Sequence, residues 1–235
     1  MASPGYALSR SVKEGGIAFK LAHGEDVFDF LSLNSELNSI FNQGMASITT
    51  TTMDAIISSY RNGFLGLKGT VVDVGGGIGV AISEIVKAYP HLKGINFDLP
   101  HVISNAPPYD GVTHVAGDMF NAIPPAETIF MKTIVTLVFP FQTILHSWND
   151  DDCVKILQNC RKAIPKETGK VIMVEIILDR TEDDPFNDIR VTSDLAMLCF
   201  SSGRERNERE WEKLLGKSGF CHYNIVKIPT LFSII

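Results

Sequence analysis

The sequence predicts an α/β protein with a mostly parallel sheet and helices on both faces of that sheet. Short runs rich in β-branched residues alternate with helical segments from residue 70 onward, a pattern typical of strand–helix–strand units. One of these runs, residues 71–74, leads directly into a glycine-rich loop. The chain has 235 residues, of which 45% are hydrophobic, and this is enough for one well-buried α/β domain.

The expected strands are the runs between helical segments and two runs in the tail. They are residues 71–74, 94–97, 112–115, 128–131, 171–178, 223–228 and 231–235. Residues 10–60 mix polar and apolar positions and are expected to be helical. Within them, a threonine-rich run at 49–52 is expected to precede a helix at 53–60.

Two later helices carry start and stop signals. Asn149 precedes three aspartates and a helix that Pro165 ends. Asn207 and Glu210 have the spacing of a capping box, and the helix that they open is expected to end at Gly219.

Charge and composition exclude several classes of partner. Asp and Glu number 27 against 21 Lys and Arg, a formal charge of -6, and no basic run is present, so nucleic acid is not an expected partner. The N-terminus lacks an apolar signal core and no apolar stretch is long enough to span a bilayer, so neither secretion nor membrane insertion is expected. Four cysteines lie among apolar neighbours without a C-x-x-C pair, which predicts buried, reduced thiols in a cytoplasmic protein. They are Cys153, Cys160, Cys199 and Cys221.

The glycine loop predicts a ligand site. Glycines let a backbone approach a ligand closely and adopt φ values that a Cβ forbids. Gly75, Gly77 and Gly79 form a G-x-G-x-G pattern. A dinucleotide site requires G-x-G-x-x-G/A, and Val80 stands where its third small residue belongs. The spacing therefore disfavours NAD and a nucleotide-dependent oxidoreductase.

Two acidic residues follow the next two predicted strands. Asp98 ends the second strand, where a ribose diol needs an acceptor. Asp118 follows the third strand, where an adenine amino group donates, and Met119 beside it is placed to pack on the ring. Ligand-type positions at the carboxyl ends of successive strands favour a cofactor site over tight packing alone.

Seven motifs occur along the chain in a fixed order. They are FNQGM at 41–45, VDVGGGIG at 72–79, NFDLPHV at 96–102, GDMF at 117–120, FMK at 130–132, LHSWND at 145–150 and GRER at 203–206. Together they resemble the plant S-adenosylmethionine-dependent O-methyltransferase family that acts on phenylpropanoids, flavonoids and alkaloids. The resemblance implies a Rossmann-like methyltransferase fold with a mostly parallel seven-stranded sheet and an antiparallel C-terminal strand.

The resemblance also implies the site residues and their cofactor. The implied contacts of S-adenosylmethionine are Gly75, Asp98, Asp118, Met119 and Lys132. His146 is implied as the catalytic base, with Glu175 and Glu205 flanking it. A phenol with a pKa near 10 is about three units from ionised at neutral pH, a deficit of roughly 4 kcal/mol, which a histidine within hydrogen-bond reach can remove by taking the proton. No cluster of Asp, Glu and His has metal-ligand spacing, so no metal is expected.

The same resemblance implies the domain organisation. Residues 1–60 correspond to a helical remnant of the N-terminal dimerisation region, and residues 61–235 to the S-adenosylmethionine-binding catalytic domain. The family homodimer is expected to be weakened here, because most of the dimerisation domain has no counterpart. Further departures are an apolar segment within 133–144, interpreted as a translated intron remnant, a serine at 147 in place of an acidic residue, and an end inside the last expected strand.

Two functions of different kinds follow from these observations. The first is an O-methyltransferase that acts on a hydroxyl of a small phenolic or alkaloid and releases S-adenosylhomocysteine. The second is a truncated, catalytically weak S-adenosylmethionine-binding isoform. N-methylation is a further alternative on the same scaffold, and the sequence does not identify the acceptor.

Overall fold

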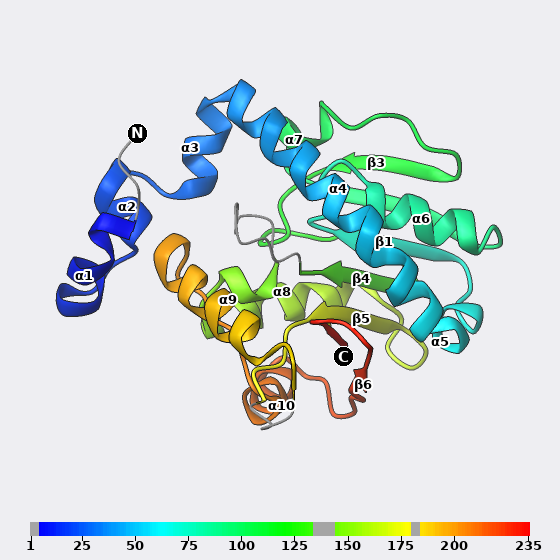
Figure 1. Cartoon of the computed structure of the whole chain (residues 1–235). Helices are drawn as coiled ribbons and strands as arrows, with labels where there is room; N and C mark the ends of the chain where they lie inside the picture. The colour runs from blue at the N-terminus through cyan, green and yellow to red at the C-terminus, as the bar shows by residue number, and fades with distance from the viewer. Residues whose placement is uncertain (1–4, 134–143, 180–183) are drawn as a thin grey trace.

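The computed structural model describes residues 5–133, 144–179 and 184–235. Across these residues, seven strands form one sheet in the order β3-β2-β1-β4-β5-β7-β6 (Figure 1). β1 to β5 pair in parallel, whereas β7 runs antiparallel to both β5 and β6, so the predicted sheet is confirmed. The strands are β1 Thr70–Val74, β2 Lys93–Asp98, β3 Val112–Ala116, β4 Thr128–Lys132, β5 Lys170–Glu175, β6 Val226–Lys227 and β7 Ser233–Ile234.

In the described part of the chain, helices surround this sheet, and the first helices lie beyond it at the N-terminus. The helices are α1 Gly5–Glu14, α2 Ala18–His23, α3 Val27–Leu33, α4 Ser35–Ser59, α5 Arg61–Leu65, α6 Val80–Ala88, α7 Pro100–Ile103, α8 Asp150–Ala163, α9 Asn187–Phe200 and α10 Glu208–Lys217. A short 3₁₀ turn, η1 Leu145–Ser147, precedes α8. None of these helices combines the length and the apolar character that crossing a membrane requires.

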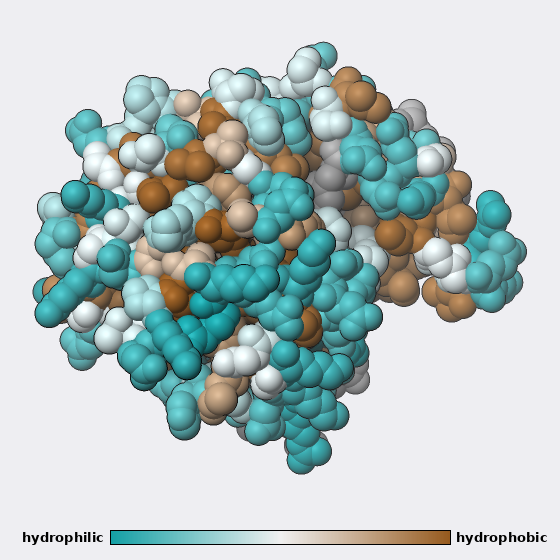
Figure 2. Space-filling view, turned by 180° about the vertical axis from the view of Figure 1, so that it is seen from behind, coloured by the Kyte–Doolittle hydropathy of each residue, from teal (hydrophilic) through white to brown (hydrophobic). Residues whose placement is uncertain are grey.

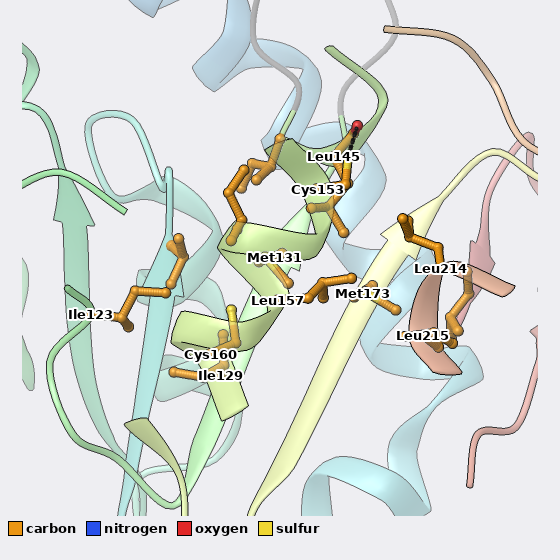
Figure 3. Close-up of a cluster of buried hydrophobic side chains, with 14 of the residues drawn as sticks. Ile123, Ile129, Met131, Leu145, Cys153, Leu157, Cys160, Met173, Leu214 and Leu215 are labelled. Atoms are coloured by element: carbon orange, nitrogen blue, oxygen red, sulfur yellow. Dashed lines mark hydrogen bonds between the residues drawn. The ribbon is translucent and has the colours of Figure 1, made fainter. Parts of the chain in front are cut away.

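Successive side chains of each strand point to opposite faces of the sheet, and helices cover both faces, so both sets of side chains are buried. On β1, Val71 belongs to a cluster with α4, α5 and α6, and Val72 belongs to a cluster with α8 and α10. Figure 3 shows the second cluster, in which Leu157 of α8 and Leu214 of α10 lie beside Met173 of β5. This double burial explains why the strands read as continuous apolar runs.

A third cluster joins the N-terminal helices to α4. Phe19 of α2 and Val27 of α3 pack with Phe41 and Met45 of α4, and α1 and α2 also contact α9 through pairs such as Phe19 and Phe200. In Figure 1, α1 and α2 stand apart from the sheet as a separate lobe. From behind, this lobe carries apolar residues next to the main body (Figure 2).

The predicted start of a helix at residue 53 is wrong, because α4 runs unbroken from Ser35 to Ser59. The hydroxyls of Thr50, Thr51 and Thr52 donate to the carbonyls four residues earlier, at 3.0, 3.1 and 3.0 Å. These bonds satisfy the hydroxyls inside a helix, so the threonines do not interrupt it.

Three further predictions need correction. The run 171–178 is a strand only as far as Glu175, after which Ile177 forms an isolated bridge with Arg206. The two tail strands shrink to two residues each. Of the cysteines, Cys153 and Cys160 are buried, whereas Cys199 is half-buried and Cys221 exposed. Residues 134–143, which hold most of the apolar segment between the lysine and histidine motifs, lie outside the described part of the chain.

Both predicted caps are confirmed. The Asn149 side chain accepts from the Asp152 N–H at 3.0 Å and opens α8. Asn207 accepts from the Glu210 N–H at 3.0 Å, and the Glu210 carboxylate accepts from the Asn207 N–H at 3.0 Å. These bonds orient α10, which buries Trp211 under the sheet.

We expect Asn207→Ala to lower the free energy of unfolding by about 1 kcal/mol, because it removes the side-chain acceptor of the cap. Asn207→Asp keeps that acceptor and serves as the control. Urea denaturation of both variants measures the effect. Equal losses in the two variants would contradict the capping argument.

Candidate active site

The candidate site lies at the carboxyl ends of the parallel strands, where the strand order reverses between β1 and β4. The chain passes from β1 outward to β2 and β3 and then returns to β4 on the other side of β1. Crevices of open α/β sheets form at such reversals. Asp98, Asp118 and Lys132 all lie at or just after strand ends at this edge.

The glycines of the loop between β1 and α6 occupy positions where a side chain is strained or does not fit. Gly75, Gly77 and Gly79 have φ values of 65°, 60° and 90°, a region that favours glycine. A Cβ on Gly76 would lie 2.2 Å from Asn96 Oδ1 and 2.7 Å from Asp73 Oδ2. The loop therefore presents bare backbone to the crevice.

Two side chains of β2 hold the loop in place. Asn96 donates from Nδ2 to the Gly77 carbonyl at 2.9 Å. Asp98 accepts from the Gly77 N–H at 2.7 Å and from the Leu99 N–H at 2.6 Å. Burial raises the pKa of Asp98 to about 6, although both N–H donors oppose the shift. Strand β2 thus supplies the side chains that support the glycine loop and the carboxylate of Asp98 beside it.

A cavity of about 300 Å³ opens beside the loop. Four of the predicted cofactor residues line it, namely Gly75, Asp98, Asp118 and Met119. The Asp118 carboxylate accepts from the Phe120 N–H at 2.8 Å and from Asn121 Nδ2 at 2.9 Å, which fixes the turn after β3. Phe41 and Asn42 of α4 contribute to the same wall.

Two aromatic residues of the cavity carry no role in the sequence-based assignment. Phe120 and Trp148 line the cavity, and their rings meet edge to face with centroids 4.7 Å apart. Phe120 belongs to the GDMF motif and Trp148 to the LHSWND motif, and only the fold brings the two rings together. An aromatic wall of this kind suits an aromatic ring of a ligand.

Lys132 lies outside this cavity, in a smaller hollow of about 20 Å³ that shares Gly75 with it. Its Nζ is 3.5 Å from Thr49 Oγ1 of α4. Burial lowers the pKa of Lys132 to about 7 against the opposing charge of Asp73, and burial raises the pKa of Asp73 to about 7. The hollow therefore holds a buried acid and a buried base beside the loop.

The three predicted catalytic residues lie together. His146 sits in η1, and its Nδ1 is 2.7 Å from Glu205 Oε1. Ser193 of α9 donates to the same oxygen at 2.5 Å. Glu175, at the end of β5, accepts from Thr133 Oγ1 at 2.5 Å. His146 and Glu175 are fully buried, and Glu205 nearly so.

The carboxylate of Glu205 determines which ring nitrogen of His146 is left for chemistry. A carboxylate only accepts, so Nδ1 carries the proton of the pair and Nε2 keeps its lone pair in the neutral ring. Nε2 has no hydrogen-bond partner among the described residues. Burial by itself lowers the pKa of His146, but the charge and hydrogen bond of Glu205 outweigh it, so that the pKa is raised. Glu205 therefore makes the imidazole a stronger base.

Glu175 provides a second carboxyl group near the ring. Burial raises its pKa to about 7, while the charge of His146 and the Thr133 hydroxyl oppose the shift. Within the described ranges, no three His, Cys, Asp or Glu side chains are grouped so as to hold a metal ion. The chemistry of this arrangement is that of a buried, carboxylate-oriented base.

Comparisons with solved structures define the class of fold. The chain superposes on the structure titled LaPhzM with a TM-score of 0.85 at 29% identity, covering 98% of this chain and 67% of that one. It superposes on human N-acetylserotonin methyltransferase in complex with SAM with a TM-score of 0.83 at 20% identity, covering 98% and 65%. The fold is that of S-adenosylmethionine-dependent methyltransferases.

Sequence comparisons narrow the class. Residues 6–221 match the O-methyltransferase domain. Desmethylxanthohumol 6'-O-methyltransferase of Humulus lupulus is 48% identical over 225 residues, and (R,S)-reticuline 7-O-methyltransferase of Papaver somniferum is 41% identical over 234. These alignments cover 95% and 99% of this chain but only 61% and 63% of the relatives. The chain belongs to the plant O-methyltransferase family.

We expect Glu175→Gln to change how stability depends on pH. The folded chain keeps a proton on Glu175, with its pKa raised to about 7, that the unfolded chain releases above the ordinary value of 4.5. Stability of the wild type therefore declines as pH rises from 4.5 through 7, and the glutamine variant escapes this loss. The gain at pH 8 should be on the order of 3 kcal/mol.

Urea denaturation between pH 4 and 8 measures this difference. Glu167→Gln, at an exposed position, is the matched control and should follow the wild type. Parallel pH profiles for the wild type and Glu175→Gln would show that Glu175 does not titrate in this window.

Proposed function

We propose that the chain transfers a methyl group from S-adenosylmethionine to a hydroxyl of a small plant phenolic, such as a flavonoid, a phenylpropanoid or a phenolic alkaloid, with His146 as the base. One observation carries the proposal. The Nδ1 of His146 is held by Glu205 while its Nε2 has no partner among the described residues. The residues on either side of this turn, Ile144 and Trp148, line the 300 Å³ cavity.

The cavity suits the proposed cofactor, which supplies an electrophilic sulfonium methyl group when bound. Bare backbone at Gly75 permits close approach. The Asp98 carboxylate has about four acceptor sites and uses two for Gly77 and Leu99, so two are left for ribose hydroxyls. Asp118 and Met119 are proposed to contact the adenine. Lys132 is proposed to face the amino-acid end, beyond Gly75.

The proposed role of His146 and its two carboxylate neighbours is to remove the proton from the acceptor hydroxyl. Nε2 of His146 is proposed to take the hydroxyl proton, so that the acceptor oxygen becomes a nucleophile. Glu205 then stabilises the imidazolium at Nδ1 and holds the ring orientation. Glu175 adds negative potential near the same ring. The deficit of roughly 4 kcal/mol for an un-ionised phenol is of the size that such a base removes.

The acceptor class and the domain roles rest on the relatives. Desmethylxanthohumol 6'-O-methyltransferase and (R,S)-reticuline 7-O-methyltransferase are named for a phenolic and an alkaloid acceptor. We assign cofactor binding to residues 61–235 and dimerisation to the family region that includes 1–60. Exposed apolar side chains on the N-terminal helices and α9, among them Leu33, Ile40 and Leu195, support a homodimer contact. Two buried thiols, Cys153 and Cys160, support a cytoplasmic location.

A second candidate function is cofactor binding without turnover. One observation favours it, because the His146 side chain has 0% exposure. An acceptor reaches Nε2 only after groups around the ring move. Turnover distinguishes the two candidates, since both require the cofactor cavity.

We expect S-adenosylhomocysteine to bind with micromolar affinity in isothermal titration calorimetry. Gly76→Ala should weaken this binding at least about tenfold, because its Cβ enters the space of Asn96 and Asp73. Gly216→Ala, where a Cβ meets nothing within 4 Å, should bind as the wild type does. A folded wild type that shows no binding heat would overturn both candidate functions.

We expect His146→Gln to retain S-adenosylhomocysteine binding and to lose at least about 100-fold in methyl transfer to a phenolic acceptor. Transfer of labelled methyl from S-adenosylmethionine to a panel of flavonoids, hydroxycinnamates and benzylisoquinolines measures the rate. Cofactor binding without transfer by the wild type would favour the non-catalytic alternative. Equal rates for both proteins would exclude His146 as the base.

A further inference from the structure

One buried cation, Arg206, grips the turn that carries His146. Its Nη1 donates to the Leu145 carbonyl at 3.1 Å and its Nη2 to the Trp148 carbonyl at 2.8 Å. Those carbonyls stand on either side of His146, so one planar guanidinium bridges both sides of the turn. A lysine, with a single nitrogen at the end of a flexible stem, does not reproduce this fork.

The remaining groups of the guanidinium are also satisfied. Nε donates to Asp150 Oδ1 at 2.9 Å, and Cζ lies 5.5 Å from the centroid of the buried Trp211 ring. Arg206 is only 1% exposed. Because buried ion pairs are often no more stabilising than apolar groups of similar volume, stability alone gives a weak reason for this residue.

The segment that carries Arg206 touches His146 in two further ways. Glu205 binds Nδ1 of the imidazole. Gly203 packs so closely on the turn that a Cβ there would lie 1.9 Å from the His146 carbonyl oxygen. Residues 203–206 therefore contact the side chain of the histidine, its carbonyl and both sides of its turn.

This segment is itself tied to the sheet. The Leu178 N–H donates to the Arg206 carbonyl at 2.9 Å, and Ile177 and Arg206 form a parallel bridge just beyond β5. The same strand ends in Glu175. The position of Arg206 relative to both carboxylates is thus determined by backbone pairing.

We infer that Arg206 is a positioning residue that sets the orientation of the His146 imidazole by clamping the carbonyls of Leu145 and Trp148. Arg206 lines neither the 300 Å³ cavity nor the hollow at Lys132. Its action is to keep Nδ1 directed at Glu205 and Nε2 directed at the acceptor oxygen. The kinetic test of this inference rests on the proposed function. The spectroscopic test depends only on the hydrogen bond between His146 and Glu205.

The first measurement is independent of catalysis. In histidine-labelled protein with S-adenosylhomocysteine added, NMR should show a strongly downfield Nδ1–H resonance from the 2.7 Å bond of His146 to Glu205. His146→Gln identifies the signal by removing it. In Arg206→Lys and Arg206→Met the resonance should shift upfield or vanish, while S-adenosylhomocysteine affinity stays within about twofold. A resonance unchanged in both variants would overturn the inference.

The second measurement is the rate of methyl transfer and its pH profile. Arg206→Lys should lower kcat on the order of 100-fold with little change in KM, as expected for a misplaced base. The positive charge of Arg206 lowers the pKa of His146. Arg206→Met removes this charge, so the pKa of His146 should rise and the ascending limb of kcat should move to higher pH. An unchanged pH profile together with an unchanged kcat would contradict a positioning role.

Two milder variants guard against a simple failure to fold. Asp150, whose side chain is 44% exposed, is the charge partner of Arg206, and Asp150→Asn should lower kcat by roughly threefold to tenfold in a folded protein. Arg204 also pairs with Asp150, at 3.2 Å, but makes no hydrogen bond to the turn among the described residues. Arg204→Gln should therefore retain both rate and resonance. A loss in Arg204→Gln equal to that in Asp150→Asn would assign the effect to surface charge and overturn the clamp.

The outcomes also separate this inference from the proposed function. A wild type that shows the downfield resonance but transfers no methyl group would refute the proposed function alone. In that case, loss of the resonance in the Arg206 variants still supports the clamp.

Discussion

The register between β1 and β2 is the constraint on which the site depends. Asp73 lies opposite Asn96 and Val74 opposite Phe97, so the loop after β1 begins level with the end of β2. From this position, the Gly75 N–H donates to the Phe97 carbonyl at 2.8 Å. A slip of one residue would turn every side chain of the strand to the other face and remove the supports of the loop. The 300 Å³ cavity beside the loop depends on this pairing.

Much of the fold and site could be predicted because the signals are local. The G-x-G-x-G loop, the acidic residues after successive strands and the cap at Asn207 depend on neighbours in the sequence. The length of α4 could not be predicted, because it depends on whether the threonine hydroxyls find carbonyls within the helix. The strands β6 and β7 pair over only two residues each, with β7 between β5 and the edge strand β6, and their apolar runs overstate their length.

The site residues divide in the same way. Glu205 and Glu175 were assigned by resemblance, and their convergence on His146 required the folded chain. Arg206 lies in a quoted motif, yet its partners stand 61 and 58 residues away in the sequence. Neither composition nor spacing indicates that an arginine binds two distant carbonyls. The same holds for Phe120 and Trp148, whose rings meet only in three dimensions.

Several ionisable side chains at the site are nearly or fully buried, among them Asp73, Lys132, His146 and Glu175. Burial disfavours the charged form of each of these groups. The folded chain is therefore less stable at any pH where such a group has to carry its charge. Groups with strongly shifted pKa values concentrate where chemistry occurs. Burial brings the pKa values of Asp73, Lys132 and Glu175 to about 7, so these three groups titrate near neutral pH.

Helix α4 links the N-terminal helices, the cavity, the hollow at Lys132 and the core. Its first half packs with Phe19 of α2 and Val27 of α3 and supplies Phe41 to the cavity, its middle places Thr49 beside Lys132, and its last part inserts Met53 into the core. A helix of 25 residues is a stiff rod about 38 Å long. One continuous helix therefore joins the N-terminal helices to the cavity wall and to the core, and Phe41 is held in that wall by an element that is packed at both ends.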